Sequence, residues 1–529
     1  MMWQYITRRK FDFYGQYMEK ENKKGVNLLG TAVMMGVITV FAKFLGLLRD
    51  ILVARAYGTG IEAVAYDTAS RLPVLLFDFV IGGVVSAALI PVFSELLVKK
   101  GKDEAVRFSV AYVNLMLMIT TAITLIGIVF AKELVGFLAP DIAPEAQVLA
   151  VKLTRIMFPM IIFTGLAFSF VGILQSLGEF NIPALISLVS NSIMVIYLFT
   201  LNSVFGITGL AVAMLLGWAS QAMIQAPKLH ALGWRYSLRC DLRSPYIKKS
   251  MKNAVPILLG TWTQPVCSLI NTRFASGLNG GRAITALGYA NRLYTIIAGV
   301  FTFVCTNLLF PYMSRAAASG NKDESRKMMT TSIKILVFII APITVGIFML
   351  ATPITALIYE RGEFNASDTA LTATALSRYA FGMVFLAANE LLVKAFFADG
   401  DTKVPMFSSI AAMVLNIVLV TLTSDKLGVG GIALASGIAM ILNFTINCIV
   451  KYRRDGALFS LSDVADFARS VASAAIMGVA VYFLRGISSS PIVTIAICVP
   501  CGVIVYALST LIMRSEETRY FTAKLSRRG

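Results

Sequence analysis

The first long apolar run of the sequence, residues 28–56, contains four charged residues: Lys43, Arg49, Asp50 and Arg55. A charge near the middle of a membrane-spanning helix costs about 2.5–3.5 kcal/mol on insertion scales, so such residues usually face a bundle interior or a watery cavity. The planar guanidinium group of arginine donates paired hydrogen bonds to phosphate. We therefore predict that Lys43, Arg49 and Arg55 line a cationic cavity that binds an anionic ligand.

A second apolar run, residues 66–94, also contains charged residues. Asp67 and Arg71 are spaced i,i+4, and Asp78 follows near the same helix face. A salt bridge that holds helices together explains Asp67 and Arg71 as well as a role in ligand binding does. We predict that Arg71 binds substrate and that Asp67 and Asp78 are gating or charge-pair residues.

Later runs contain Arg292, and the i,i+4 pair Glu390 and Lys394. A salt bridge that holds helices together explains this pair equally well, and we predict a gating or charge-pair role for it. Basic residues nevertheless outnumber acidic residues in the apolar runs, and an unpaired cation there needs water or an anionic ligand. Arg292 is therefore a further candidate for the cavity.

These charged runs belong to a chain of 529 residues, of which 57% are hydrophobic and 14% charged. Apolar runs of about 20 residues recur along the whole length, which predicts an all-α polytopic membrane protein with fourteen transmembrane helices and not a β-barrel. The predicted spans are 28–56, 66–94, 109–131, 148–175, 182–203, 207–226, 253–277, 284–312, 329–357, 369–397, 404–423, 429–450, 465–484 and 491–513.

The net charge of +18 comes mostly from Lys and Arg in alternate loops between the spans. This positive-inside pattern places both termini in the cytoplasm and does not indicate nucleic-acid binding. The pattern also predicts a cytoplasmic N-terminal extension over residues 1–27, a basic cytoplasmic linker over 227–252 and a cytoplasmic tail over 514–529.

An internal repeat divides most of the chain. The segment from Gly178 to Pro183 aligns with Gly400 to Pro405, and the alignment continues without a gap at a shift of 222 residues. Ala69-Ser70-Arg71-Leu72 likewise matches Ala290-Asn291-Arg292-Leu293. We therefore predict two six-helix lobes, 28–226 and 253–450, related by an axis along the membrane normal with a substrate site between them. The last two spans, within 451–513, lie outside the repeat.

Several kinds of chemistry have no support in the sequence. The single histidine, His230, lies in a basic loop, and the CxxC motif of Cys498 and Cys501 lies in an apolar run. A phosphate-binding loop is missing too. We therefore expect a transporter with no cofactor, no metal and no enzymatic activity of its own, driven by a gradient, the membrane potential or consumption of its substrate.

Several short segments occur in a specific order along the chain. They are Leu45-Gly46 with Arg49-Asp50 and Val53-Ala54-Arg55, Arg71-Leu72-Pro73, Pro183-Ala184-Leu185 followed by Asn191, Tyr289 to Leu293, Arg361-Gly362-Glu363-Phe364, and Ala395 to Ala398 before Asp401-Thr402-Lys403-Val404-Pro405. In these segments the sequence resembles the MurJ (MviN) lipid II flippases of the multidrug/oligosaccharidyl-lipid/polysaccharide exporter superfamily, and the resemblance covers the first twelve predicted spans.

The resemblance implies two lobes around a cationic cavity that opens alternately to either side, and a groove for a polyprenyl tail in the last two spans. The substrate would be lipid II, moved across a bacterial cytoplasmic membrane, with membrane lipids and the cell-wall synthesis machinery as further partners. Arg49 and Arg292 match family arginines that hold the diphosphate, and Asp50 and Asn191 match a family aspartate and asparagine.

The sequence departs from the family pattern in three places. Ala42-Lys43 stands where many members have Ser-Arg, which keeps the charge without its bidentate geometry. A cavity arginine of many members falls on Phe77, and Arg71 or Arg55 would have to compensate. Some members hold sodium with carboxylates in spans 7 and 11, which contain no Asp or Glu here.

Two other functions fit a chain of this class: a cation-coupled multidrug exporter, or a flippase for another polyprenyl-linked oligosaccharide. An exporter of organic cations needs an acidic, aromatic cavity, and the surplus of basic residues argues against it.

Overall fold

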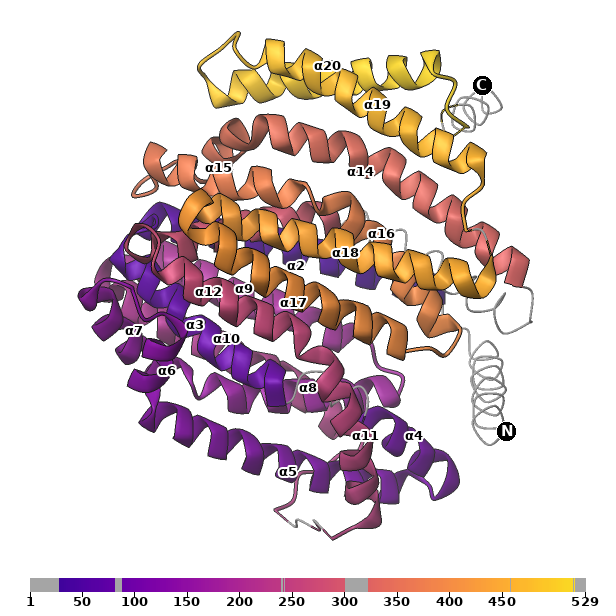
Figure 1. The fold of residues 1–529 in the computed structure, drawn as a ribbon. Helices are drawn as coiled ribbons and strands as arrows, with labels where there is room; N and C mark the ends of the chain where they lie inside the picture. Colours follow the sequence, from indigo (N-terminus) through magenta and orange to yellow (C-terminus); the bar gives the residue numbers. More distant parts are fainter. Residues whose placement is uncertain are drawn as a thin grey trace.

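The computed structural model describes residues 28–80, 88–238, 241, 243–299, 322–456, 458–516 and 518. Within these ranges every regular element is a helix and none is a strand, as predicted. The two predicted terminal extensions, 1–27 and most of 514–529, lie outside the described residues, and so do residues 81–87 of the second predicted span. Figure 1 shows the helices stacked into one elongated bundle, with α5 along one edge and α20 along the opposite edge.

The helices of the N-lobe are α2 (Leu28–Tyr57), α3 (Ile61–Val80), α4 (Ile90–Lys99), α5 (Lys102–Val129), α6 (Ala131–Leu138), α7 (Pro144–Met157), α8 (Met160–Ser176), α9 (Asn181–Thr200) and α10 (Asn202–Ala231). Those of the C-lobe are α12 (Thr263–Ser276), the short η2 (Asn279–Gly281), a helix described over residues 282–299, α14 (Lys322–Tyr359), α15 (Ala366–Ala380), α16 (Met383–Ala398), α17 (Lys403–Leu427) and α18 (Val429–Asp455). Between the lobes lies α11 (Pro245–Thr261), and α19 (Leu461–Leu484) and α20 (Pro491–Ile512) follow the C-lobe.

The lengths and hydropathy of the helices confirm a multi-pass membrane protein. Eight described helices are long and apolar enough to cross a membrane, and the number rises to ten if each of two bent pairs is one span. One bent pair is α7–α8, with an angle of 41°, and the other is α15–α16, with an angle of 47°. The predicted total of fourteen spans stays a prediction.

The structure repeats as the sequence does. The breaks in the two bent pairs fall near Pro159 and Phe381, which correspond at the shift of 222 residues. Two glycines with positive φ are also equivalent: Gly206 (φ 53°, ψ −149°), at a kink near the start of α10, and Gly428 (φ 57°, ψ −138°), between α17 and α18. Only glycine adopts this backbone region without strain, so each hairpin depends on its glycine.

Buried amide side chains repeat in the same way. The Nε2 atom of Gln225 on α10 donates to the backbone oxygen of Ala167 on α8 at 3.1 Å. The corresponding residue on α18, Asn447, donates to the side chain of Asn389 on α16 at 2.8 Å, and Asn389 corresponds to Ala167. Polar contacts of this kind hold helices together where hydrophobic packing gives no preference over lipid.

The predicted seventh span is broken into α11 and α12 at Trp262, between Pro256 and Pro265. α11 packs on α3, α4 and α5 of the N-lobe, whereas α12 packs on α17 of the C-lobe. The indole nitrogen of Trp262 donates to the backbone oxygen of Phe79 at 2.7 Å. The predicted start of the C-lobe at residue 253 therefore falls inside a helix that belongs by contact to the N-lobe.

The last two helices pack along α14, outside the repeat (Figure 1). Lys334 of α14 pairs with Asp463 at 3.0 Å and Asp466 at 2.9 Å on α19, and with Glu516 beyond α20. A separate cluster of buried apolar residues lines this contact and includes Ala341, Leu350, Ala474, Met477, Val481, Cys498 and Tyr506.

Candidate functional site

Arg49 and Asp50, in the C-terminal half of α2, form a charged triad together with Arg292 of the C-lobe. Both Nε and one terminal nitrogen of Arg49 donate to Asp50 Oδ1, at 2.9 and 2.6 Å. The other terminal nitrogen of Arg49 donates to Asn191 Oδ1 on α9, at 2.9 Å. Gly46, one turn earlier, packs beside the same residue, since a Cβ there would lie in ordinary contact with the Asn191 amide, at 3.5 Å. The Arg49 guanidinium is therefore held in a fixed orientation from two sides.

The second carboxylate oxygen of Asp50 belongs to the other lobe. Arg292, on the helix described over residues 282–299, places its Nε 2.7 Å from Asp50 Oδ2. Asp50 is 8% exposed, whereas the Arg292 side chain is 50% exposed. One buried carboxylate thus joins two guanidinium groups from the two lobes, and the outer surfaces of these groups stay open to a ligand.

A cavity of about 370 Å³ lies beside this triad. Its charged lining residues are Lys43, Arg49 and Arg292, and among the described residues that line it none carries a carboxylate. The remaining lining residues are Thr39, Ala42, Gly46, Ala184, Ser187, Asn191, Thr295 and Ile296. Three cations facing one cavity in a membrane protein favour an anionic ligand, and two guanidinium groups suit phosphate oxygens.

The third cation is placed less tightly than the two arginines. Lys43 is half-buried, and its Nζ lies against the backbone of Gly299, where a Cβ would come within 3.3 Å of it. An ammonium group is a point charge with no planar fork. Lys43 therefore adds to the positive potential of the cavity without fixing the geometry of a ligand.

Arg71 lies on the opposite contact between the lobes. Its terminal nitrogens donate to Thr272 Oγ1 at 2.9 Å and to the backbone oxygen of Ile284 at 3.2 Å. Asp67 is close by, since a Cβ on Gly288 would lie 3.1 Å from Arg71 and 3.5 Å from Asp67. Arg71 is not one of the described residues that line the cavity.

The two contacts between lobes are related by the repeat. We call the contact of α2 with the 282–299 helix the first seam, and the contact of α3 with α12 the second seam. Arg71 corresponds to Arg292 at a shift of 221 residues, and Asp50 corresponds to Thr272 at a shift of 222. Each seam therefore has an arginine that reaches across to the equivalent position, with a carboxylate as acceptor in the first seam and a hydroxyl group in the second.

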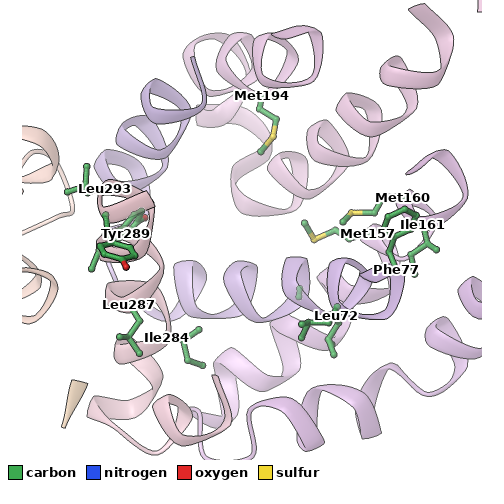
Figure 2. Close-up of a cluster of buried hydrophobic side chains, with 14 of the residues drawn as sticks. Leu72, Phe77, Met157, Met160, Ile161, Met194, Ile284, Leu287, Tyr289 and Leu293 are labelled. Carbon is green, nitrogen blue, oxygen red and sulfur yellow. The ribbon is translucent and has the colours of Figure 1, made fainter. Parts of the chain in front are cut away.

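Position 77 does not face the cavity. Phe77 is buried, its ring lies 5.6 Å from the ring of Phe168, and Figure 2 shows it beside Met160 and Ile161 in the apolar core of the N-lobe. The same view shows Tyr289 and Leu293 on one helix at some remove from this cluster. The exchange of a family arginine for Phe77 therefore takes no cation from the cavity in this structure.

The other predicted site residues lie outside the described lining of the cavity. Arg55 is exposed, and its backbone oxygen accepts a hydrogen bond from the C-lobe, from the backbone nitrogen of Glu363 at 2.9 Å. Asp78 is half-buried on α3, and Glu390 is exposed and Lys394 half-buried on α16. The roles predicted for these residues stay predictions.

Three hydroxyl-bearing residues of the cavity have no charge to mark them in the sequence: Thr39, Ser187 and Thr295. Helical spacing from the charged residues would have found them. Thr39 is one turn before Lys43 on α2, Ser187 is one turn before Asn191 on α9, and Thr295 follows Arg292 at i+3.

A helical bundle of two repeated lobes with a cationic cavity at their contact defines a polytopic membrane transporter. A solved structure described as "Lipid II flippase MurJ, inward closed conformation" shares this fold, with a TM-score of 0.79 at 23% identity over 91% of this chain and 99% of that chain. An inward-facing multidrug transporter of the MATE family shares it more distantly, with a TM-score of 0.65 at 18% identity over 81% of this chain and 98% of the other.

The sequence comparison is more specific. The profile of the family "Lipid II flippase MurJ" matches residues 53–500, so the chain belongs to this family. A probable lipid II flippase MurJ of Rhizobium tropici is 29% identical over 87% of each chain. The lipid II flippase MurJ of Burkholderia cenocepacia is 26% identical over 79% of this chain and 82% of its own. The family consists of transporters, not enzymes.

Proposed function

We propose that this chain is a lipid II flippase, which moves undecaprenyl-diphosphate-linked disaccharide-pentapeptide from the inner to the outer leaflet of the bacterial cytoplasmic membrane. Membership of the family supports this function. The observation that carries the proposal for the site is the cavity itself, which joins Lys43, Arg49 and Arg292 at the contact of the two lobes.

The diphosphate group binds between Arg49 and Arg292. Asp50 pairs with both guanidinium groups and keeps them oriented, at 2.6 and 2.7 Å. The diphosphate, with more negative charge than one carboxylate, competes with Asp50 for their outer donors. Asn191 keeps Arg49 in place during this exchange, and Lys43 attracts the substrate through its charge.

The size of the cavity supports transport by alternating access. A volume of about 370 Å³ holds about a dozen water molecules at ~30 Å³ each. The diphosphate fits this space, but the disaccharide-pentapeptide head group needs several times more. The lobes must therefore move apart at one face to admit the head group and at the other face to release it.

The arrangement in the membrane follows from the charge pattern of the loops. Both termini lie in the cytoplasm, residues 28–226 and 253–450 form the two moving lobes, and residues 451–513 form the groove for the polyprenyl tail. The surplus of cations in the cavity makes its reorientation sensitive to an inside-negative membrane potential.

Replacement of each arginine tests the diphosphate site. In cells depleted of their own flippase, we expect Arg49→Ala and Arg292→Ala to fail to support growth, because each removes one of the two phosphate-binding groups. Arg107→Ala, which removes an exposed arginine paired with Glu104 at 3.6 Å, is the matched control and is expected to support growth. Normal growth of both cavity variants at normal expression would contradict the site.

Transport by the purified protein tests the substrate. We expect purified protein to flip lipid II in liposomes, faster under an imposed inside-negative potential. A parallel measurement with an undecaprenyl-diphosphate-linked oligosaccharide of another composition, and one with an organic cation, distinguishes the two alternative functions. Transport of the organic cation without transport of lipid II would refute the proposal.

A further inference from the structure

At the end of the first seam beyond the cavity, one carboxylate of the C-lobe binds the N-lobe directly. Asp368, at the start of α15, is 2% exposed. Its Oδ1 accepts one hydrogen bond from Thr59 Oγ1, just after α2, and another from a terminal nitrogen of Arg282. The Nε atom of Arg282 also donates to Thr59 Oγ1, at 2.9 Å. We call Thr59, Arg282 and Asp368 the latch.

Beside the latch, the backbones of the two lobes are in direct contact. The backbone nitrogen of Glu363 donates to the backbone oxygen of Arg55 at 2.9 Å. A Cβ on Gly58 would come within 2.5 Å of the Glu363 oxygen, and a Cβ on Gly362 would overlap the Arg55 oxygen. Both glycines also have positive φ, of 56° and 63°. The two glycines thus interlock, and any side chain on either would force the lobes apart here.

The latch and the cavity lie on the same pair of helices. Asp50 on α2 precedes Thr59, which lies just after α2, by nine residues, and on the 282–299 helix Arg292 follows Arg282 by ten. At a rise of 1.5 Å per residue the latch lies about 14 Å along the seam from the charged triad. The hydroxyl group of Tyr289 donates to the backbone oxygen of Gly58 at 3.3 Å between them. A separation of the helices at one of these points is therefore transmitted to the other.

Asp368 also belongs to the capping box of α15, so its position in the latch depends on the first turn of this helix. Its Oδ2 accepts from the backbone nitrogen of Asn365, and the Asn365 side chain accepts from the backbone nitrogens of Ser367 and Asp368. This capping box fixes the first turn of α15. The carboxylate thus stays positioned for Thr59 and Arg282 as long as α15 is capped.

We infer that the latch closes the outer face of the cavity and sets how often that face opens to release the anionic head group. The inference rests on the proposed function for the direction of transport and for the assignment of the outer face, at which α2 ends. Thr59, Arg282 and Asp368 are positioning residues, because none of them is among the described residues that line the cavity. They act by holding α2 and the 282–299 helix together.

The test measures access to the cavity and needs no transport. The six native cysteines are replaced by serine, and Ile296, which lines the cavity, is replaced by cysteine as a reporter. Right-side-out membrane vesicles are treated with a membrane-impermeant anionic methanethiosulfonate reagent, and the rate of labelling is compared between variants. We expect Asp368→Asn and Arg282→Gln to label about tenfold faster than the parent, because a charge-assisted hydrogen bond is lost from only the closed state.

Two further variants serve as controls for the labelling experiment, one at the backbone contact beside the latch and one at a carboxylate elsewhere in the C-lobe. Gly362→Ala leaves every latch side chain in place but forces the backbones apart, so it is expected to label faster as well. Asp425→Asn removes an exposed carboxylate near the C-terminal end of α17 in the same lobe, and this variant is expected to label like the parent. Arg282→Gln leaves the α15 cap untouched, so faster labelling by this variant cannot come from a frayed helix.

Equal labelling of the parent and of both latch variants, with a lowered melting temperature, would make the latch a stabilising contact only and would overturn the inference. Faster labelling only in inside-out vesicles would place the latch at the cytoplasmic face and would also overturn it. Faster labelling from outside in a protein that does not flip lipid II would leave the latch standing and refute the proposed function instead.

Discussion

The two seams between the lobes have the same geometry and different chemistry. In the first seam, Arg292 reaches Asp50, which also binds Arg49, and all this charge lies beside the cavity. In the second seam, Arg71 reaches Thr272, and the residue equivalent to Arg49 is Asn271. Gene duplication thus supplied one scaffold twice, and only one copy of the contact is charged enough to exchange its acceptor for an anionic substrate.

The largest expected difference in flipping rate is between variants of Asp50 and Thr272, the residues that Arg292 and Arg71 reach across the two seams. We expect Asp50→Ala to reduce flipping in liposomes by about 10- to 100-fold, because Arg49 loses its charge-assisted hydrogen bonds, Arg292 loses its ion pair, and both guanidinium groups are misplaced. Thr272→Ala removes one neutral acceptor and is expected to change flipping by less than about fivefold. Equal losses in the two variants would show that the seams share the work of transport.

Variants of Arg292 and Arg71 are expected to differ in whether they lose substrate binding or thermal stability. Arg292→Ala is expected to leave the melting temperature in detergent almost unchanged, because this side chain is half exposed, but to abolish the stabilisation that added lipid II gives to the parent protein. Arg71→Ala leaves Thr272 and the Ile284 oxygen without their donor, at a cost of about 1–3 kcal/mol, and is expected to lower the melting temperature while the shift with lipid II remains. If lipid II still stabilised Arg292→Ala but no longer stabilised Arg71→Ala, the substrate would bind at the second seam.

The hairpin glycines mark where the lobes should behave alike. Gly206→Ala and Gly428→Ala each put a Cβ into open space, so their cost is backbone strain alone, about 1–3 kcal/mol. We expect equal drops in melting temperature for the two variants. A drop in only one would indicate that the lobes unfold separately and that one is the weaker.

The smallest effect is expected from loop carboxylates at repeat-related positions outside the membrane. Burial alone would raise the pKa of Glu179, but the hydrogen bonds from Lys228 and from the backbone nitrogen of Asn181 lower it. Burial alone would also raise the pKa of Asp401. The hydrogen bonds that Asp401 accepts from Arg454 and from two backbone nitrogens outweigh burial and lower this pKa.

A lowered folded-state pKa means that the stabilisation is fully present above the unfolded-state pKa, about 4.3 for Glu and 3.9 for Asp, and is lost as the pH falls through the folded value. We expect a loss of about 0.5–1 kcal/mol per pair below about pH 4, since the lysine and arginine partners are partly exposed. The difference in melting temperature between pH 7 and pH 3.5 should shrink in Glu179→Gln and in Asp401→Asn. If both variants kept the melting-temperature difference of the parent, the lowered pKa values of Glu179 and Asp401 would not explain the loss of stability at low pH.

The sequence was enough to predict the helical class, the repeat, and three charged residues that the structure brings together beside one cavity. Charges in apolar runs are costly enough to be informative, which singled out Arg49, Asp50 and Arg292. Helical spacing could not predict that Arg71 faces α12 and not the cavity, because the face that a buried residue presents is set by the packing of its neighbours. For the same reason Arg55 could not be assigned to the backbone contact that it makes with Glu363.

The break in α11–α12 had a weaker signal. Two prolines bracket Trp262, but nothing in the hydropathy of the run indicated that its first half would pack on the N-lobe. A continuous apolar run predicts a path through the membrane and not which neighbours the path will meet. The positions of α11 and of the second seam were therefore beyond what composition and periodicity determine.

The docking of α19 and α20 has a consequence for how this chain could have grown. Their apolar cluster, with Met477 and Tyr506, is separate from the main core of the bundle, and Lys334 is the hub of their polar contact. A hairpin joined in this way was added to a finished bundle without repacking it. The same place on α14 is where further helices could be grafted, exchanged or removed during evolution while the transport machinery stayed unchanged.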